Sequence, residues 1–283
     1  MTKRLLPLTN DYVFKRNFGY KGEEEVTKVL LKDITKSNIS FVELDNNPIT
    51  QKDLYDEKLG IMDVKATMDG NVICDIEVQV VKQIDIIKRI MFYWSKMYSR
   101  EVKSGSGYET AKRTICVLIA DFELKETEYI EKYITKWNLR EEDYPKKILT
   151  DCMEFYIIEL PKVTKYQKQN KYKNLNLWVE FIKNPEVNFM VEKDDDELKE
   201  TIDAIEKAKE NLEKISEDEH ERELSRLREK YIRDQYSIKA TGYAEGIKQE
   251  KIDTAKKMLS KGIDIDTIIE ITELTKEEIE KLK

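Results

Sequence analysis

The stretch IMDVKATMDGNVICDIEVQV, residues 61–80, gathers the side chains of this chain that could do chemistry. Apolar and polar residues alternate on both sides of Asp69-Gly70-Asn71, and this pattern predicts two strands joined by a tight turn. The polar positions are Asp63, Lys65, Asp75, Glu77 and Gln79. Any reaction on this face must therefore rest on carboxylates, an amide and a lysine, to which a hard cation could be added.

The length of the turn decides which of these side chains share a face, because side chains alternate along a strand. A two-residue turn would pair Asp63 with Ile76 and would mix charged and apolar residues on both faces. A three-residue turn pairs Asp63 with Glu77 and Lys65 with Asp75. It also collects the apolar residues on the other face: Met62, Val64, Ala66, Ile76 and Val78. Burial favours the three-residue turn, and we expect Asn71 to take the left-handed conformation at its end.

In this register the Cβ atoms of Asp63 and Glu77 are expected to lie about 5 Å apart. Two like charges in opposed positions destabilise a hairpin, so one must be protonated or a cation must lie between them. Oxygen ligands at such a spacing suit Mg²⁺ or Mn²⁺. The alternative is a solvated hairpin face on which Lys65 and Asp75 form an ordinary surface pair.

Several kinds of site are excluded by composition. His220 is the only histidine, which argues against Ser-His-Asp and Cys-His catalysis and against a zinc site. The chain has 9 glycines and none follows the spacing of a phosphate-binding loop. The three cysteines lie in apolar runs, and we expect buried thiols in a reducing cytoplasm. No apolar run approaches 18 residues and the N-terminus does not resemble a secretory signal, so no membrane association is expected.

The order of the elements predicts an α/β fold with a mixed sheet flanked by helices, followed by an all-helical C-terminal region. The expected helices of the first part are 22–34, 83–102 and 174–184, and its expected strands beyond the hairpin are 113–124 and 152–160. The composition changes near Pro185, so we expect a first domain over 1–185 and a charged helical region over 186–283. Residues 192–230 hold 9 basic and 16 acidic residues, a net charge of −7, and the whole chain has the same net charge of −7. The N-terminal part is therefore nearly neutral and can offer a locally basic surface.

The hairpin resembles the signature of the PD-(D/E)XK nuclease superfamily, with Asp63 on one strand and Glu77-Val78-Gln79 on the next. The Glu-x-Gln form is similar to the Rpn family of recombination-promoting nucleases and transposases. Other stretches match that family in order: NDYVFKRNFG, RIMFYWSKMY, GYETAKRTICVLIADFEL, FYIIELPK, LNLWVEFIKN and AKKMLSKGIDIDTIIEITELTKEEIEKL. The resemblance covers nearly the whole chain.

The resemblance implies a restriction-endonuclease-like core and Mg²⁺- or Mn²⁺-dependent cleavage of DNA phosphodiester bonds in recombination or transposition. Asp63 and Glu77 would hold the metal, and Gln79 would place the attacking water. Gln79 stands where the superfamily has a lysine, so positive charge near the transition state must come from another residue, for which Lys65 is a candidate. The alternative is a catalytically weak DNA-binding or assembly protein that keeps the fold.

Some further residues are candidates for supporting roles. Asp11 is either a helix cap or an additional acid of the site. Arg89 and Tyr93, four residues apart on one helix, could contact a phosphate beside the metal. The segment KVTKYQKQNKYK (162–173) has five lysines and no acid, and Lys165 and Lys168 are its candidate phosphate contacts. The closing helix pair has the length of a helix-turn-helix, but it is acidic. We therefore expect the C-terminal helices to mediate homo-oligomerisation or regulation.

Overall fold

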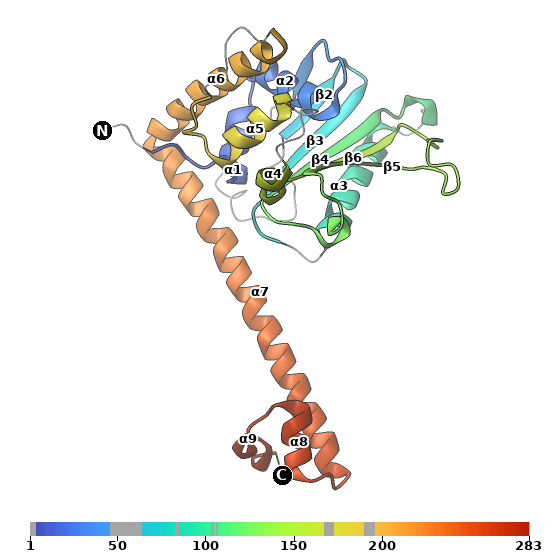
Figure 1. Ribbon diagram of the computed structural model, residues 1–283, viewed down its shortest axis with the longest axis vertical. Coiled ribbons are helices and arrows are strands. Elements are labelled where there is room, and N and C mark those ends of the chain that lie inside the picture. The colour runs from blue at the N-terminus through green and yellow to red at the C-terminus, as the bar shows by residue number, and fades with distance from the viewer. Residues whose placement is uncertain are drawn as a thin grey trace. The chain divides into compact units, whose positions relative to one another are not determined.

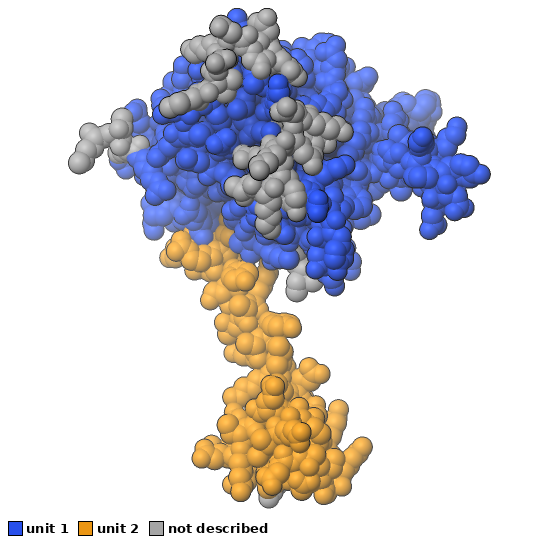
Figure 2. Space-filling view, in the orientation of Figure 1, with its two compact units in different colours: residues 1–229 blue, residues 230–283 orange. Residues whose placement is uncertain are grey.

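The computed structural model describes residues 4–45, 64–82, 85–102, 105, 107–166, 173–189 and 196–282. The described residues divide into two compact units, residues 1–229 and 230–283 (Figure 2). The first unit contains a sheet with helices on both faces, and the second is helical (Figure 1). The predicted mixed sheet with flanking helices and a helical C-terminal region is thereby confirmed.

The sheet has six strands in the order β1-β2-β3-β4-β6-β5. Their bounds are β1 Val42–Leu44, β2 Val64–Met68, β3 Val72–Gln79, β4 Arg113–Ala120, β5 Ile134–Asn138 and β6 Met153–Glu159. The three central strands β3, β4 and β6 run parallel to one another, whereas β1, β2 and β5 pair antiparallel. The carboxyl ends of β3, β4 and β6 therefore meet at one edge of the sheet, where open α/β sheets bind their ligands.

One face of the sheet packs on a helical layer formed by four helices. They are α1 Asp11–Phe18, α2 Glu24–Thr35, α5 Lys173–Lys183 and α6 Asp196–Glu217. Their apolar side chains, including Trp178 and Phe18, join Ile76 of β3 and Val117 of β4 in the main core. The short helix α4, Leu160–Tyr166, follows β6 directly.

The opposite face of the sheet is covered by α3, Ile86–Glu101 (Figure 1). Ile86, Ile90 and Met97 of α3 pack on Leu118 and Ile157 of the sheet. Other side chains of α3 are exposed, among them Phe92, so this helix is amphipathic rather than largely buried as its composition suggests. The short 3-10 helices η2, Tyr108–Thr110, and η3, Lys125–Thr127, flank β4 in the chain.

The division after Glu229 differs from the boundary after residue 185 that the composition suggests. Helix α6 lies beyond that boundary, yet it belongs to the first unit. Its apolar stripe of Ala204, Ile205, Ala208 and Leu212 is buried in the main core. The many charged residues of such a helix lie on its solvent-facing side. A rise in charge along the sequence therefore does not mark the end of the domain.

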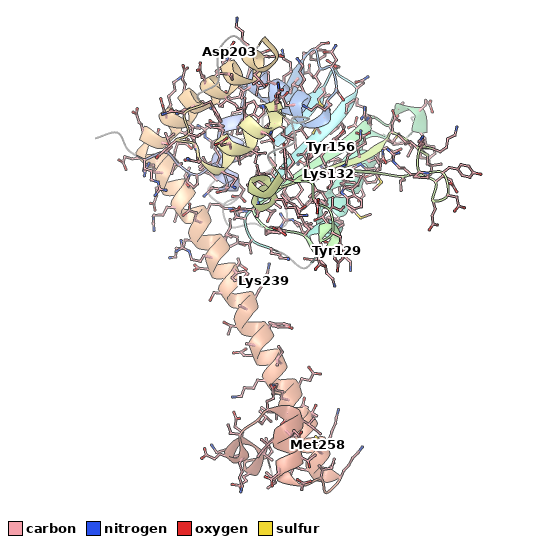
Figure 3. The ribbon with its side chains drawn as sticks, in the orientation of Figure 1. Tyr129, Lys132, Tyr156, Asp203, Lys239 and Met258 are labelled. Carbon is pink, nitrogen blue, oxygen red and sulfur yellow. The ribbon has the colours of Figure 1, made fainter. Side chains whose placement is uncertain are left out.

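The second unit contains the last part of α7, Glu219–Ser260, with α8, Ile265–Thr272, and α9, Lys276–Glu280. Met258, labelled in Figure 3, packs with Ile268 and Ile279 in a small core of its own. Asp264 caps α8, and Thr275 with Glu278 forms a capping box at the start of α9. None of the described helices is long and apolar enough to cross a membrane.

Candidate active site

The hairpin of β2 and β3 has the register that burial favours in the sequence. Lys65 pairs with Asp75 and Val64 pairs with Ile76, and three residues, 69–71, make the turn. Directly opposed side chains lie on the same face, so Lys65 shares a face with Asp75. Glu77 and Gln79 follow at alternate positions of β3 and lie on this face too. It is the face that α3 covers, whereas Cys74, Ile76 and Val78 point into the main core.

The turn itself differs in one respect from the sequence-based expectation. Asp69 and Gly70 take positive φ angles of 47° and 71°, and Asn71 does not. The Asp69 carboxylate accepts hydrogen bonds from the backbone N–H groups of Ser40 and Phe41, at 2.9 and 3.0 Å. These bonds hold an aspartate in the left-handed region and connect the turn to the segment before β1, a partner that local spacing could not reveal.

Glu77 is the centre of the polar contacts on this face. Its Oε1 atom accepts a hydrogen bond from Nε2 of Gln79 at 2.8 Å and lies 3.0 Å from NH2 of Arg89. The Glu77 side chain is 5% exposed and that of Arg89 is 18% exposed. A carboxylate removed from water needs a partner of opposite charge, and Arg89 provides it here. The charge of Glu77 is therefore compensated by a guanidinium, whereas the opposed Asp63 lies outside the described residues.

Two expected residues lie on α3: Arg89 contacts Glu77 directly, and Tyr93 lies beside Arg89. Arg89 reaches Glu77 from the helix, and its guanidinium lies 5.6 Å from the centre of the Tyr93 ring, in cation–π geometry. Their spacing of four residues does put both side chains on one face of the helix. A direct contact between Arg89 and the Glu-x-Gln motif was not expected, because helix and strand meet only through the tertiary fold.

Asp11 is not brought to this face. It lies on α1, and Tyr12 and Phe14 of the same helix pack in the main core on the other side of the sheet. Its carboxylate is 2.7 Å from the guanidinium of Arg228, in a largely buried ion pair within the first unit. The structure therefore assigns Asp11 to the attachment of α7, and its interpretation as an additional acid of the site is wrong.

The remaining expected residues fall outside the described parts of the chain or have another role. Asp63 and Lys168 lie outside the described residues, as does the side chain of Lys165. Lys162, from the same lysine-rich segment, is buried beside Glu159 and contributes no exposed charge. Cys74 and Cys116 are buried free thiols, as expected, whereas Cys152 is only partly buried. Burial raises the pKa of the Cys74 thiol far above its usual value.

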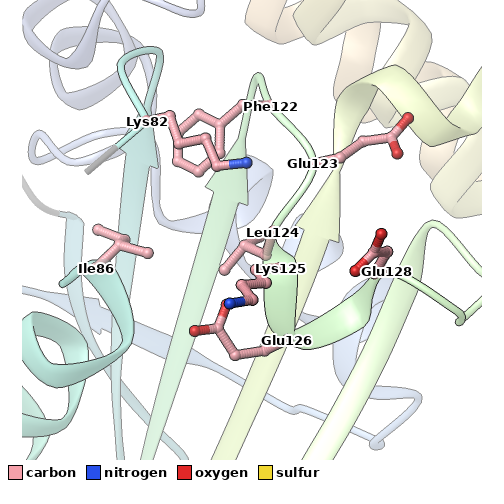
Figure 4. Close-up of a pocket in the computed structure, with 8 residues that line it drawn as sticks. All are labelled: Lys82, Ile86, Phe122, Glu123, Leu124, Lys125, Glu126 and Glu128. Carbon is pink, nitrogen blue, oxygen red and sulfur yellow. The ribbon is translucent and has the colours of Figure 1, made fainter. Parts of the chain in front are cut away.

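A pocket of about 520 Å³ opens at the carboxyl ends of β3 and β4 (Figure 4). It is lined by Lys82, Ile86, Phe122, Glu123, Leu124, Lys125, Glu126 and Glu128. Ile86 and Leu124 belong to the apolar cluster beneath α3, so the pocket lies on the same side of the sheet as Glu77. The N–H of Asp121 donates to the carbonyl oxygen of Gln79 at 2.9 Å, which joins the start of the pocket loop to the end of the Glu-x-Gln motif.

The donor set on this face has the chemistry that a hard divalent cation requires. Asp75 and Glu77 offer carboxylate oxygens, and Gln79 offers an amide oxygen. Within the described residues, no group of three or more His, Cys, Asp and Glu side chains is arranged to hold a metal ion. Asp63, the further acid implied by the resemblance, immediately precedes the first described residue of β2. The described side chains of this face therefore supply oxygen donors of the kind that a hard divalent cation binds, with Glu77 between Asp75 and Gln79 on β3.

Two family models match the chain, one after the other along the sequence. A family model described as PD-(D/E)XK nuclease family transposase matches residues 8–242. A second model, described as the C-terminal HTH domain of the Rpn/YhgA-like nuclease family, matches residues 248–283. No curated protein and no solved structure gives a significant match. Because the first model spans most of the sequence, and the second covers the segment that follows, this chain belongs to the PD-(D/E)XK nuclease family transposases of the Rpn type.

Proposed function

We propose that this chain is a metal-dependent DNA endonuclease that hydrolyses phosphodiester bonds in DNA recombination or transposition. The observation that carries the proposal is the face of β3, where Asp75, Glu77 and Gln79 alternate beside a pocket at the carboxyl ends of the parallel strands. Membership of a nuclease family supports hydrolysis as the reaction class.

The proposal gives each residue of the face a role. Asp63 and Glu77 hold Mg²⁺ or Mn²⁺, which when bound supplies Lewis-acid stabilisation of charge on the phosphate oxygens. Gln79 orients the attacking water through its amide. Lys65 lies on this face through its pairing with Asp75, and it supplies the positive charge that the neutral Gln79 lacks. Arg89 and Tyr93 contact the DNA backbone from α3, and Lys165 and Lys168 add phosphate contacts.

One observation favours a second candidate, a catalytically weak DNA-binding or assembly protein. Gln79 donates a hydrogen bond to Glu77, and Arg89 neutralises the same carboxylate. Both contacts could equally maintain a buried polar cluster that performs no chemistry.

Nicking of supercoiled plasmid separates the two candidates. The full-length chain is incubated with Mg²⁺, Mn²⁺ or a chelator, and Glu77→Gln serves as the matched control because it keeps the shape of the side chain. Cleavage that needs the metal and is lost in Glu77→Gln supports the endonuclease. DNA binding without metal-dependent cleavage at any enzyme concentration supports the second candidate.

We propose that the chain forms a homo-oligomer through α7. Tyr236 and Tyr243 are exposed, and their spacing of seven residues places them on one face of the helix, with Ile247 one turn further. Residues 230–250 are largely exposed and include Gly242 and Gly246, which weaken an isolated helix by about 1 kcal/mol each. Packing against a second copy would compensate for that loss.

The terminal helices give less support to contact with DNA. The family model that matches residues 248–283 is described as a C-terminal HTH domain. Its helices α8 and α9 nevertheless carry Asp266, Glu270, Glu277 and Glu278, which repel phosphate. We therefore propose that this unit acts in assembly or regulation rather than by reading a DNA groove.

A further inference from the structure

We propose that Arg89 controls cation binding at Glu77: the guanidinium competes with the cation for Oε1, and a DNA phosphate draws Arg89 away. This inference rests on the proposed function, because it concerns the same carboxylate, but it assigns a regulatory property that nuclease activity alone does not require. It makes Arg89 a positioning residue that couples DNA binding to metal binding.

The competition follows from the contacts of one oxygen atom. Oε1 of Glu77 lies 3.0 Å from NH2 of Arg89 and accepts a hydrogen bond from Gln79 at 2.8 Å. The carboxylate is 5% exposed, so water cannot solvate its charge in place of a partner. Binding of a divalent cation to this oxygen therefore competes with Arg89 and with Gln79.

Arg89 is the group that has to leave. Gln79 is neutral, and its backbone is held by pairing with Ala120 in the parallel ladder. Arg89 carries a full positive charge, which repels a divalent cation at the same oxygen. Its side chain is long, comes from the neighbouring helix and is 18% exposed, so it can turn toward solvent.

Tyr93 offers a second position for the displaced guanidinium. The ring lies on the same helix with its centre 5.6 Å from the Arg89 guanidinium, and a closer cation–π contact needs only rotation of the arginine side chain. At Glu77 the carboxylate compensates the charge of the Arg89 guanidinium, whereas the neutral ring of Tyr93 does not. The position at Glu77 is therefore preferred until another anion is present.

A DNA phosphate is that anion. Guanidinium groups bind phosphate through paired hydrogen bonds, so a backbone phosphate beside α3 competes with Glu77 for Arg89. When Arg89 moves to the phosphate, Oε1 becomes available to the cation. DNA and metal then bind with positive coupling, and each raises the affinity for the other by the same factor.

The test measures Mn²⁺ binding to the full-length chain by electron paramagnetic resonance, without cleavage as a readout. Arg89→Gln is compared with wild type and with Lys88→Gln, which removes the same charge from an exposed position one residue away on α3. We expect Arg89→Gln to bind Mn²⁺ about tenfold more tightly in the absence of DNA, a coupling typical of competing sites. Lys88→Gln should stay within about twofold of wild type, because its charge is exposed to solvent and screened.

The second arm adds a short phosphorothioate duplex that resists hydrolysis. It should raise the Mn²⁺ affinity of the wild type by a larger factor than that of Arg89→Gln, because only the wild type also gains from removal of the competing guanidinium. Thermal melting checks the folded state. Without Mn²⁺, Arg89→Gln should have a lower melting temperature than wild type, and addition of Mn²⁺ should raise its melting temperature by more. If this variant does not fold, Arg89→Met also removes the charge but keeps a long unbranched side chain, and its Mn²⁺ affinity should lie above that of wild type.

Glu77→Gln separates the failure of this inference from that of the proposed function. If Glu77→Gln binds Mn²⁺ as tightly as wild type, Glu77 is not a ligand and the proposed metal site is overturned together with this inference. If Glu77→Gln loses binding while the Arg89 variants match wild type, the metal site stands and the competition is disproved. A similar gain in Mn²⁺ affinity in Lys88→Gln would show that general charge repulsion, and not competition for Oε1, sets the affinity. That result would also overturn the inference.

Discussion

The carboxylate of Glu159 and the ammonium of Lys162 lie 2.8 Å apart, with side chains that are 0% and 3% exposed. Glu159 ends β6 and also accepts hydrogen bonds from the N–H of Leu124 and the hydroxyl of Thr127. Lys162 donates to the carbonyl oxygens of Thr127 and Ile130. This pair therefore fastens the loop after β4, which forms a wall of the pocket, to the carboxyl end of β6.

Replacement of Lys162 by Ala should destabilise the protein severely. It leaves the Glu159 carboxylate buried without its cation, and breaking a buried pair in this way costs about 3–5 kcal/mol. Urea unfolding followed by circular dichroism measures the loss, with the exposed Lys132→Ala, labelled in Figure 3, as the control that changes little. A Lys162→Ala variant as stable as Lys132→Ala would show that the pair does not anchor the loop.

Lys65 should matter for cleavage more than a surface lysine does. In the transition state charge grows on phosphate oxygens, and loss of one preorganised positive group lowers the rate by about 10²-fold or more. Single-turnover cleavage by Lys65→Ala at saturating enzyme measures this effect, with DNA binding expected to be little changed. If Lys65 only pairs with Asp75 across the strands, the variant cleaves at the wild-type rate and loses about 0–1 kcal/mol of stability.

Asp63→Ala and Glu77→Ala should each abolish metal-dependent plasmid nicking. Glu77→Ala should also lower the free energy of unfolding, by about 1–3 kcal/mol, because Arg89 then loses its carboxylate partner. Nicking assays and denaturant unfolding of the same preparations check both expectations. Full nicking activity in a folded Glu77→Ala variant would rule out this carboxylate as a metal ligand.

Stability should depend on pH through Glu154. Burial tends to raise the pKa of this carboxyl group, but Lys136 at 3.0 Å and Arg113 at 2.7 Å outweigh it, so the pKa is lowered. An acid with a lowered pKa stabilises the folded state above its ordinary pKa, and this contribution is lost as the pH falls through the folded value. The free energy of unfolding of the wild type should exceed that of Glu154→Gln by about 1–2 kcal/mol at neutral pH. The difference should shrink below about pH 4 in urea unfolding at a series of pH values, and a constant difference would contradict the expectation.

Self-association should depend on the tyrosine face of α7. Tyr236 is 57% exposed and Tyr243 is 70% exposed, and Tyr236→Lys/Tyr243→Lys should convert a dimer of the full chain into a monomer in sedimentation equilibrium. Ile238→Lys is the matched control, because Ile238 is 64% exposed on the same helix but faces another direction. Monomeric wild-type protein, or equal dissociation by the control, would refute association through this face.

The register of the candidate site could be predicted from the sequence alone. Of a two-residue and a three-residue turn, only the three-residue turn puts Val64, Ala66, Ile76 and Val78 on one face, and Lys65 then faces Asp75. The central strands β4 and β6 and the helices α2, α3 and α5 follow from periodicity in the same way. Such features depend on neighbours in the chain, so local pattern determines them.

The partners of the charged residues were decided only by the tertiary structure. Asp11 pairs with Arg228, which lies 217 residues away, and Glu77 pairs with Arg89 across the contact between strand and helix. A lysine-rich segment likewise predicts exposed charge, yet Lys162 is buried with Glu159. A buried charge is stabilised by whichever opposite charge the fold brings within contact, and spacing along the chain carries no record of that choice.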